Sequence, residues 1–230
     1  ENGLSSPIAV DVNADEKVDF VYAGDLKGNM WKFDLTGHNS FEWGVAYNDG
    51  AYDQPLFKAE GPHGSEQPIT SKPEVMLHPD SHGLMVLFGT GKFLGNSDFT
   101  DNSTQSVYGI WDYGDRVYYP GEWGDYSNDD DQEYLGTFTR DHLSNQPQNV
   151  TLLKQTSDPY TVFVNGENDN PVEINLRVMS SDQPIWKTRY DNDTKGKPDF
   201  PDLSDIGTSH AGWYYDLPLV GERIINDVLL

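Results

Sequence analysis

A short segment near the start of the chain carries oxygen-bearing side chains at nearly alternate positions. Positions 1, 3, 5 and 9 of residues 11–19 are Asp11, Asn13, Asp15 and Asp19. Calcium takes about six to eight oxygen ligands, and a tight loop can direct alternate side chains and a backbone carbonyl at one ion. Lys17, at position 7, would supply that carbonyl while its ammonium group points away. The segment therefore predicts a Ca²⁺ site.

Two positions of this segment depart from the calcium loop of an EF-hand. Position 6 is Glu16, where glycine usually makes a sharp turn, and position 12 is Tyr22 instead of a bidentate glutamate. Asp19 is therefore expected to bind the ion directly, or a water to complete the shell, with an affinity in the weaker, extracellular range. The alternative interpretation is an acidic turn that caps a strand, which a chain this acidic can carry without an ion.

Three other polar segments are weaker candidates for ion binding. Residues 191–199 have a similar spacing, but Lys195 occupies the fifth position and offers no oxygen ligand. His78 and His82 are four residues apart, but the proline-containing turn between them breaks helical geometry. Residues 128–133 form an acidic run. We expect a solvated loop, a surface hairpin and a solvated face at these three places.

The elements that must position these residues are predicted to be strands. Helical periodicity is nearly absent, and short apolar segments are bounded by Gly, Pro, Asn and Asp. Residues 18–23 and 30–35 predict a hairpin around a turn at 25–29, where Gly28 suits a positive φ. In the second strand, aromatic and charged residues alternate between opposite faces.

A second unit repeats this rhythm at residues 73–77, 84–88 and 107–112. The 84–88 segment is continuously apolar, which is expected when both faces of a strand are buried. A third aromatic strand that closes on Asp begins at residue 212. Repeating β-units predict a β-propeller, but two to three blades are fewer than the roughly four to eight of a closed ring. We therefore expect the remaining blades to come from a longer chain.

The predicted fold class is all-β, a partial β-propeller with a long irregular insertion. Residues 1–112 are expected to form blades with the calcium loop, residues 113–210 the insertion, and residues 211–230 the start of a further blade. The chain opens at Glu1 with no signal peptide, so we expect a fragment or a processed form. Strands within the insertion are expected at 133–139, 160–164 and 173–179.

Composition excludes several functional classes. The 230 residues carry a formal net charge of −23 and include no cysteine. Such a surface repels phosphate and anionic lipid headgroups, which disfavours binding to nucleic acid or to a membrane surface. No apolar run approaches the roughly 20 residues of a membrane helix. Disulfides and thiolate metal sites are excluded, and an aromatic fraction of 13% argues against a disordered chain.

Several blocks occur in order along the chain: residues 3–7, 11–19, 22–34, 83–92, 106–112, 139–143, 212–218 and 221–223. Together they resemble the propeller of PilY-type type IV pilus-tip proteins. Apart from residues 139–143, the insertion fits poorly, and the resemblance implies nothing about it.

The resemblance implies a large secreted bacterial protein whose C-terminal part is a modified β-propeller. It implies a calcium site at residues 11–19, with Asp11, Asn13, Asp15 and Asp19 as side-chain ligands. It also implies an extracellular, pilus-associated location and roles in pilus biogenesis, retraction control, twitching motility and surface adhesion. The partners it implies are pilus subunits or minor pilins and a host or abiotic surface. The family's von Willebrand-like domain does not occur in this sequence.

Two alternative functions belong to other classes. The aromatic strands that close on Asp resemble blade motifs of quinoprotein oxidoreductases, although a quinone site draws on a closed ring and no arginine cluster for its carboxylates is evident. The chain lacks the Gly-x-Ser-x-Gly motif of many hydrolases, and we expect no enzymatic activity. An extracellular carbohydrate- or surface-binding module is the other alternative. It would use the aromatic residues Tyr118, Tyr119, Trp123 and Tyr126.

Overall fold

The chain folds mainly as β-strands in the computed structural model, and the predicted all-β class is confirmed. Within the part described, the only helices are the short 3-10 turns η1 (Pro62–Gly64) and η2 (Asn96–Thr100). None of the helices in that part has the length and apolar character needed to cross a membrane. The structure describes residues 2–48, 51–78, 83–112, 140, 151–165, 171–184, 189–190, 198–199 and 210–227.

The first sheet contains the hairpin predicted around Gly28, which has a φ of +86°. Its two long strands pair antiparallel, from Phe20 opposite Asp34 to Gly24 opposite Met30. A small separate pair, β5 (Tyr47–Asn48) and β6 (Asp53–Gln54), follows it. The order in the sheet is β1 (Ile8–Val10), β2 (Phe20–Gly24), β3 (Asn29–Asp34) and β4 (Gly44–Val45), with β7 (Phe57–Lys58) also paired to β3.

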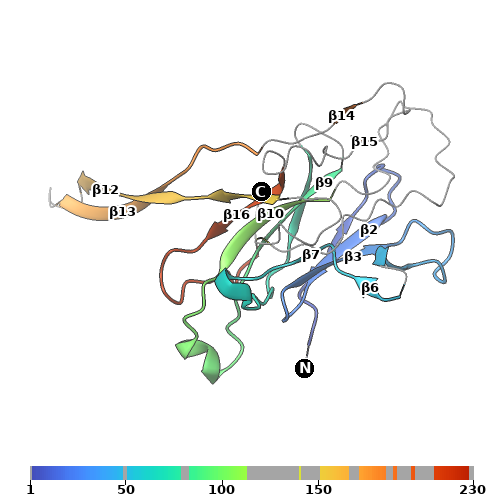
Figure 1. Cartoon of the computed structure of the whole chain (residues 1–230), viewed down its shortest axis with the longest axis horizontal. Coiled ribbons are helices and arrows are strands. Elements are labelled where there is room, and N and C mark those ends of the chain that lie inside the picture. Colours follow the sequence, from blue (N-terminus) through green and yellow to red (C-terminus); the bar gives the residue numbers. More distant parts are fainter. Residues whose placement is uncertain are drawn as a thin grey trace.

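The second sheet contains the three strands predicted for the second unit and lies beside the first (Figure 1). The order of its strands is β8 (Glu74–Leu77), β9 (Leu84–Gly89), β10 (Ser106–Asp112), β16 (His210–Asp216) and β11 (Thr151–Gln155). The pairing of β16 with β11 is parallel, and the other three pairings in this sheet are antiparallel.

The strand predicted to start a further blade at residues 211–230 instead belongs to this second sheet. It forms β16, which pairs with β10 and places Trp213 opposite Gly109. A side chain at Gly109 would come within 2.5 Å of the Trp213 indole, so glycine makes room for the ring. The aromatic pattern that ends in Asp therefore occurs both in strands of the same blade and in strands of different blades. It could not show that β10 and β16 pair, because the long insertion separates them in sequence.

The insertion separates β10 and β16 in sequence although these strands are neighbours in the sheet. Its strands β12 (Ser157–Asn165) and β13 (Pro171–Met179) include the predicted segments 160–164 and 173–179. They form a two-stranded arm that projects from the body of the molecule (Figure 1). The pair β14 (Arg189–Tyr190) and β15 (Pro198–Asp199) is shorter. The strand predicted at 133–139 lies outside the described residues.

The hydrophobic core lies between the two sheets. Tyr22 and Met30 from the first sheet and Phe88 and Tyr108 from the second are fully buried. Phe57 lies among them, with its ring centroid 5.1 Å from that of Tyr108 and 6.1 Å from that of Phe88. β9 is buried at almost every position, as its continuous apolar sequence predicted. The core therefore holds two blades together face to face.

Candidate calcium site

The 11–19 loop joins β1 to β2 at the edge of the first sheet. Its two ends are held together by backbone hydrogen bonds, because the Asp19 amide donates to the Val10 carbonyl at 2.9 Å. The Leu35 amide, just after β3, donates to the Asp19 carbonyl at 2.8 Å. The sheet thus fixes both ends of the loop and leaves its middle residues exposed to solvent.

Two of the predicted ligands meet at one backbone amide. The Asp15 amide donates to Oδ1 of Asn13 at 2.9 Å and to Oδ1 of Asp11 at 3.3 Å. The Glu16 amide donates to the other oxygen of Asp11 at 2.8 Å. The side-chain oxygens of Asp11 and Asn13 therefore lie together on the inner side of the loop.

Asp19 is the most buried of the predicted ligands, with 7% of its surface exposed. Its Oδ2 accepts a hydrogen bond of 2.8 Å from the amide of Val12, which follows Asp11. The carboxylate at position 9 of the loop is therefore directed back toward the start of the loop. The neighbouring sheet holds it there through the backbone bonds of Asp19.

The expectation that the Lys17 ammonium points away from the site is wrong. Lys17 Nζ lies 3.0 Å from Oδ2 of Asp15, and the Lys17 amide donates to Oδ1 at 2.9 Å. The reason is proximity, because a long side chain two residues after a carboxylate can fold back onto it. The hydrogen bond from Lys17 lowers the pKa of Asp15 from its ordinary value. Both side chains are well exposed, so the pair is a weak surface contact.

The sharp turn expected of glycine at position 6 is made by Glu16. Glu16 has a φ of 68° and Ala14 a φ of 60°, both in the left-handed region. That conformation costs an ordinary residue about 1–2 kcal/mol, so the rest of the loop must stabilise it. The hydrogen bonds to Asp11 and Asn13 do so, because they hold the amides of residues 15 and 16.

The set of donors fits a hard cation, because every predicted side-chain ligand offers oxygen. Asp11 and Asn13 meet, whereas Asp15 is turned to Lys17 and Asp19 to Val12. Across the described parts of the chain, no three His, Cys, Asp or Glu side chains gather as closely as metal ligands do. Calcium binding would therefore require the Asp15 carboxylate to exchange the Lys17 ammonium for the ion.

Of the weaker candidate segments, the structure describes only a part. The surface position expected for His78 is wrong, because its ring is buried against Trp111, with the two ring centroids 4.7 Å apart. His82, the acidic run 128–133 and the aromatic residues of the carbohydrate hypothesis lie outside the described residues, as does residue 195. The solvated loop at 191–199 and the solvated face at 128–133 therefore stay predictions, and the carbohydrate site stays an alternative.

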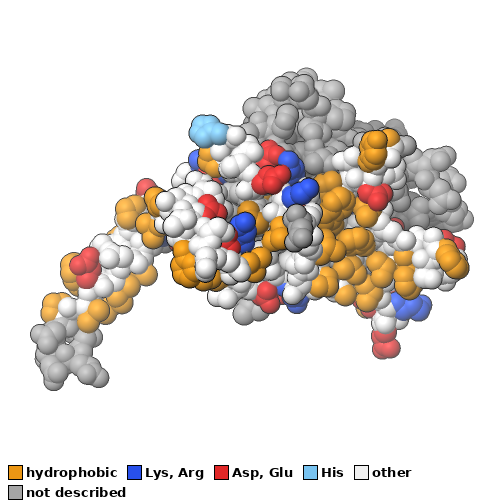
Figure 2. Space-filling model, turned by 90° about the horizontal axis from the view of Figure 1, so that it is seen from below, with side chains coloured by type: hydrophobic (Ala, Val, Ile, Leu, Met, Phe, Trp, Pro, Cys, Tyr) orange, Lys and Arg blue, Asp and Glu red, His pale blue; other side chains and the backbone are white. Residues whose placement is uncertain are grey.

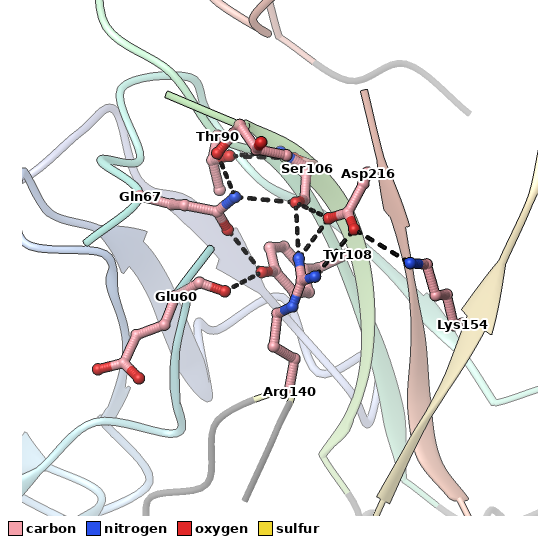
Figure 3. Close-up of polar contacts among 9 residues, drawn as sticks. Glu60, Gln67, Thr90, Ser106, Tyr108, Arg140, Lys154 and Asp216 are labelled. Carbon is pink, nitrogen blue, oxygen red and sulfur yellow. Dashed lines mark hydrogen bonds and ion pairs between the residues drawn. The ribbon is translucent and has the colours of Figure 1, made fainter. Parts of the chain in front are cut away.

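A polar network in the second blade was missed by sequence reasoning (Figure 3). The Arg140 guanidinium donates to both carboxylate oxygens of Asp216, with one contact of 2.8 Å, and its centre lies 4.3 Å from the Tyr214 ring centroid. The Ser106 hydroxyl donates to the same carboxylate at 2.7 Å. Arg140 and Asp216 are 76 residues apart, so no local signal joins them. The network ties a residue of the insertion to β10 and β16.

The network holds its groups in fixed protonation states. Burial raises the pKa of Asp216, but hydrogen bonds from Arg140 and Ser106 outweigh it and lower the pKa overall. Burial raises the pKa of Tyr108, whose hydroxyl donates to Oε1 of Gln67 at 2.6 Å. A charged pair and a neutral phenol that hydrogen-bond within a buried network support structure more than chemistry.

Comparison with known proteins gives consistent relatives. Residues 1–118 match the family model of the PilY1 beta-propeller domain. The type IV pilus biogenesis factor PilY1 of Pseudomonas aeruginosa strain PAO1 is 41% identical over 246 aligned positions, which cover 99% of this chain and 18% of that protein. A PilY1 homolog of Xylella fastidiosa strain Temecula1 is 43% identical over 117 positions, covering 50% of this chain and 8% of that protein.

A solved structure has a similar fold. The crystal structure of the Pseudomonas aeruginosa PilY1 C-terminal domain superposes with a TM-score of 0.66 at 28% identity, covering 99% of this chain and 42% of that one. The present chain thus spans less than a fifth of the length of the two relatives and under half of the solved domain. Its two sheets are part of a propeller, and the chain belongs to the family of the PilY1 β-propeller domain.

Proposed function

We propose that this chain is the calcium-binding part of a PilY1-type propeller that acts in type IV pilus biogenesis. The observation that carries the proposal is the 11–19 loop, where Asp11 and Asn13 oxygens meet and a buried Asp19 carboxylate faces the loop's start. The proposal assigns the chain no enzymatic activity, and its relatives are named as pilus biogenesis factors.

The side chains of Asp11, Asn13, Asp15 and Asp19 and the carbonyl of Lys17 would hold the ion. The three carboxylates would be partly neutralised by Ca²⁺, and the net charge of −23 favours the approach of a cation. Bound calcium would link the end of β1 to the start of β2. In the structure, hydrogen bonds from backbone amides to the loop's side-chain oxygens make that link. The edge of the first sheet would then be more rigid with calcium than without it.

Thermal unfolding tests calcium binding independently of any pilus function. A ligand at a hundred times its Kd stabilises the folded state by about 2.7 kcal/mol, which for a domain of this size raises Tm by about 5–10 °C. We expect this shift with calcium and not with magnesium. Asp19→Asn should abolish it, whereas Glu173→Gln on the exposed arm removes one charge far from the loop and should keep it. A wild-type Tm that does not change when calcium is added would rule out the site.

The proposed biological role is calcium-dependent control of pilus retraction and surface adhesion at the bacterial cell surface. Pilus subunits or minor pilins would bind either the calcium-bound or the calcium-free propeller and dissociate from the other form. The test is to replace the chromosomal gene by its Asp19→Asn form and to measure surface pili and twitching motility with and without calcium. We expect both to lose their calcium dependence at equal protein level. Unchanged calcium dependence would refute the role while leaving the binding test intact.

A further inference from the structure

The β12–β13 arm is firmly held at its base and projects from the second sheet (Figures 1 and 2). β12 follows β11 after the single residue Thr156, so the strand leaves the sheet with little interruption. At the base, the hydroxyls of Ser157 and Tyr215 share a hydrogen bond of 2.7 Å, and the Ser180 amide donates to the Thr156 carbonyl at 2.8 Å. The base of the arm is therefore part of the hydrogen-bonded structure of the blade.

One face of the arm is apolar except at its base, where Asp158 lies opposite Val178. The register places Tyr160 opposite Leu176, and the pairs that follow toward the tip on this face contain only valine and isoleucine. Alternate residues of a strand share a face, so these side chains lie together. We call this the apolar face. It consists of Tyr160, Val162, Val164, Val172, Ile174, Leu176 and Val178.

The opposite face of the arm is mixed, because it carries polar side chains and also the exposed Phe163 and Met179. The Thr161 hydroxyl donates to the Asn175 side chain at 2.9 Å, and Glu173 and Arg177 lie on the same side. The other face is the more uniformly apolar of the two, and such a face suits an apolar support. On the apolar face, however, 54% of Tyr160 and 47% of Leu176 are exposed. A two-stranded ribbon is marginally stable alone in water, so this face requires a cover.

The size of the apolar face argues against a separate molecule as that cover. Strands of nine residues are about 30 Å long, and two strands are about 10 Å wide, which gives roughly 300 Å². A stable complex buries about 800 Å² on each partner. Packing within one polypeptide avoids the loss of translational and rotational freedom that a separate partner must overcome. The cover is therefore expected within the same polypeptide.

The solved relative is longer than this chain. This chain covers 42% of the PilY1 C-terminal domain, and its two sheets are fewer than the roughly four to eight blades of a closed ring. We propose that the apolar face of the arm packs on an apolar sheet face of another blade of the same polypeptide, outside residues 1–230. The arm then clasps two parts of the ring together. This inference does not depend on the calcium loop, which lies on the first sheet.

Single cysteines test the proposal cleanly, because these 230 residues contain none. Leu176→Cys places a thiol on the apolar face, and Arg177→Cys places one on the opposite face at the adjacent position. Any cysteine elsewhere in the protein is replaced by serine, and the protein is studied as its cell produces it. We expect the thiol at 176 to react with a polar maleimide at least tenfold more slowly than the thiol at 177. Equal rates would overturn the proposal.

A photo-crosslinker attached at residue 176 identifies the cover. Crosslinks to the same polypeptide outside residues 1–230 are the expected result. Crosslinks to a second copy, recognised by mixing isotope-labelled and unlabelled protein, would overturn it, and so would crosslinks to a different protein. Leu176→Ser should also lower Tm by several degrees in that protein, while Arg177→Ser should change it by less than about one degree. Equal effects of these two substitutions would likewise contradict the proposal.

Discussion

Lys32 Nζ lies 2.9 Å from Oδ2 of Asp112, and the two side chains come from different sheets. Both side chains are only 1% exposed. The hydroxyls of Tyr22 and Tyr47 also donate to the Asp112 carboxylate, each at 2.5 Å. The Lys32 ammonium additionally lies 4.1 Å from the Phe20 ring centroid. A buried ion pair with these additional partners therefore joins the first blade to the second.

Removing the charge of Lys32 should destabilise the protein strongly. Lys32→Met keeps much of the side-chain volume but leaves Asp112 buried with no cation, which costs about 3–5 kcal/mol. Urea unfolding monitored by tryptophan fluorescence measures the loss. Lys27→Met changes an exposed side chain in the turn between β2 and β3, and it should change the free energy of unfolding by less than about 0.5 kcal/mol. A Lys32 variant as stable as the Lys27 variant would show that the pair does not join the blades.

The turn of the first hairpin should not tolerate a side chain at Gly28. Its φ is +86°, and a Cβ there would lie 2.5 Å from the Ala59 carbonyl oxygen. The left-handed conformation alone costs about 1–2 kcal/mol for alanine, and contact with fixed backbone adds to it. Chemical denaturation should therefore show that Gly28→Ala lowers the free energy of unfolding by at least that amount. Gly44→Ala, where nothing lies within 4 Å of the added carbon, is the control. Similar stability of both variants would contradict this account of the turn.

The stability of the folded protein should fall in acid through Asp25 and Asp216. Burial raises the pKa of Asp25, but hydrogen bonds from Trp31, Asn29 and Asn2 outweigh it and lower the pKa overall. The unfolded chain then binds more protons than the folded one. The stabilisation is present above the unfolded pKa of about 3.9 and is lost as pH falls through the lower folded pKa.

Urea midpoints measured from about pH 6 to about pH 2 check this dependence, because aspartate carboxylates titrate within this interval. Asp25→Asn should show a shallower decline below about pH 4 than wild type. The exposed Asp158→Asn on the arm should decline as wild type does. If Asp25→Asn lost as much stability in acid as wild type does, the hydrogen bonds to Asp25 would not contribute to the acid sensitivity of the protein.

The Arg140–Asp216 contact should depend on the shape of the guanidinium as well as on its charge. Arg140 contacts both carboxylate oxygens, and lysine cannot reproduce a two-pronged contact. Arg140→Lys should therefore lower the free energy of unfolding by about 1–3 kcal/mol, measured by urea denaturation. Arg177→Lys on the exposed arm should be neutral. A neutral Arg140→Lys would mean that charge alone holds this part of the insertion.

Local features of the fold could be predicted from the sequence. The hairpin around Gly28 follows from alternation and a turn within a few residues, and the burial of β9 follows from its apolar run. The pairing of β10 with β16 could not be predicted, because the insertion separates them and the aromatic pattern is the same in both. The contact between Lys32 and Asp112 was missed because these residues also lie far apart in the sequence. Charged residues on a predicted strand face give no sign of a partner in another sheet.

The candidate site was predictable in its composition and only partly in its geometry. The spacing of oxygen side chains identified the loop, and the structure joins Asp11 to Asn13 at one amide. The spacing could not show that Glu16 would adopt a left-handed conformation or that Lys17 would contact Asp15. Both depend on competition among hydrogen bonds within the loop, which residue spacing does not encode.

Calorimetric titration of calcium into the folded protein tests the central proposal most directly. We predict one Ca²⁺ per chain, with a Kd of about 10⁻⁴–10⁻³ M as in extracellular modules, and no binding heat for Asp19→Asn. Magnesium and the Glu173→Gln variant serve as controls for ion type and charge. Absence of binding in wild type, or binding that persists in Asp19→Asn, would contradict a calcium site in the 11–19 loop.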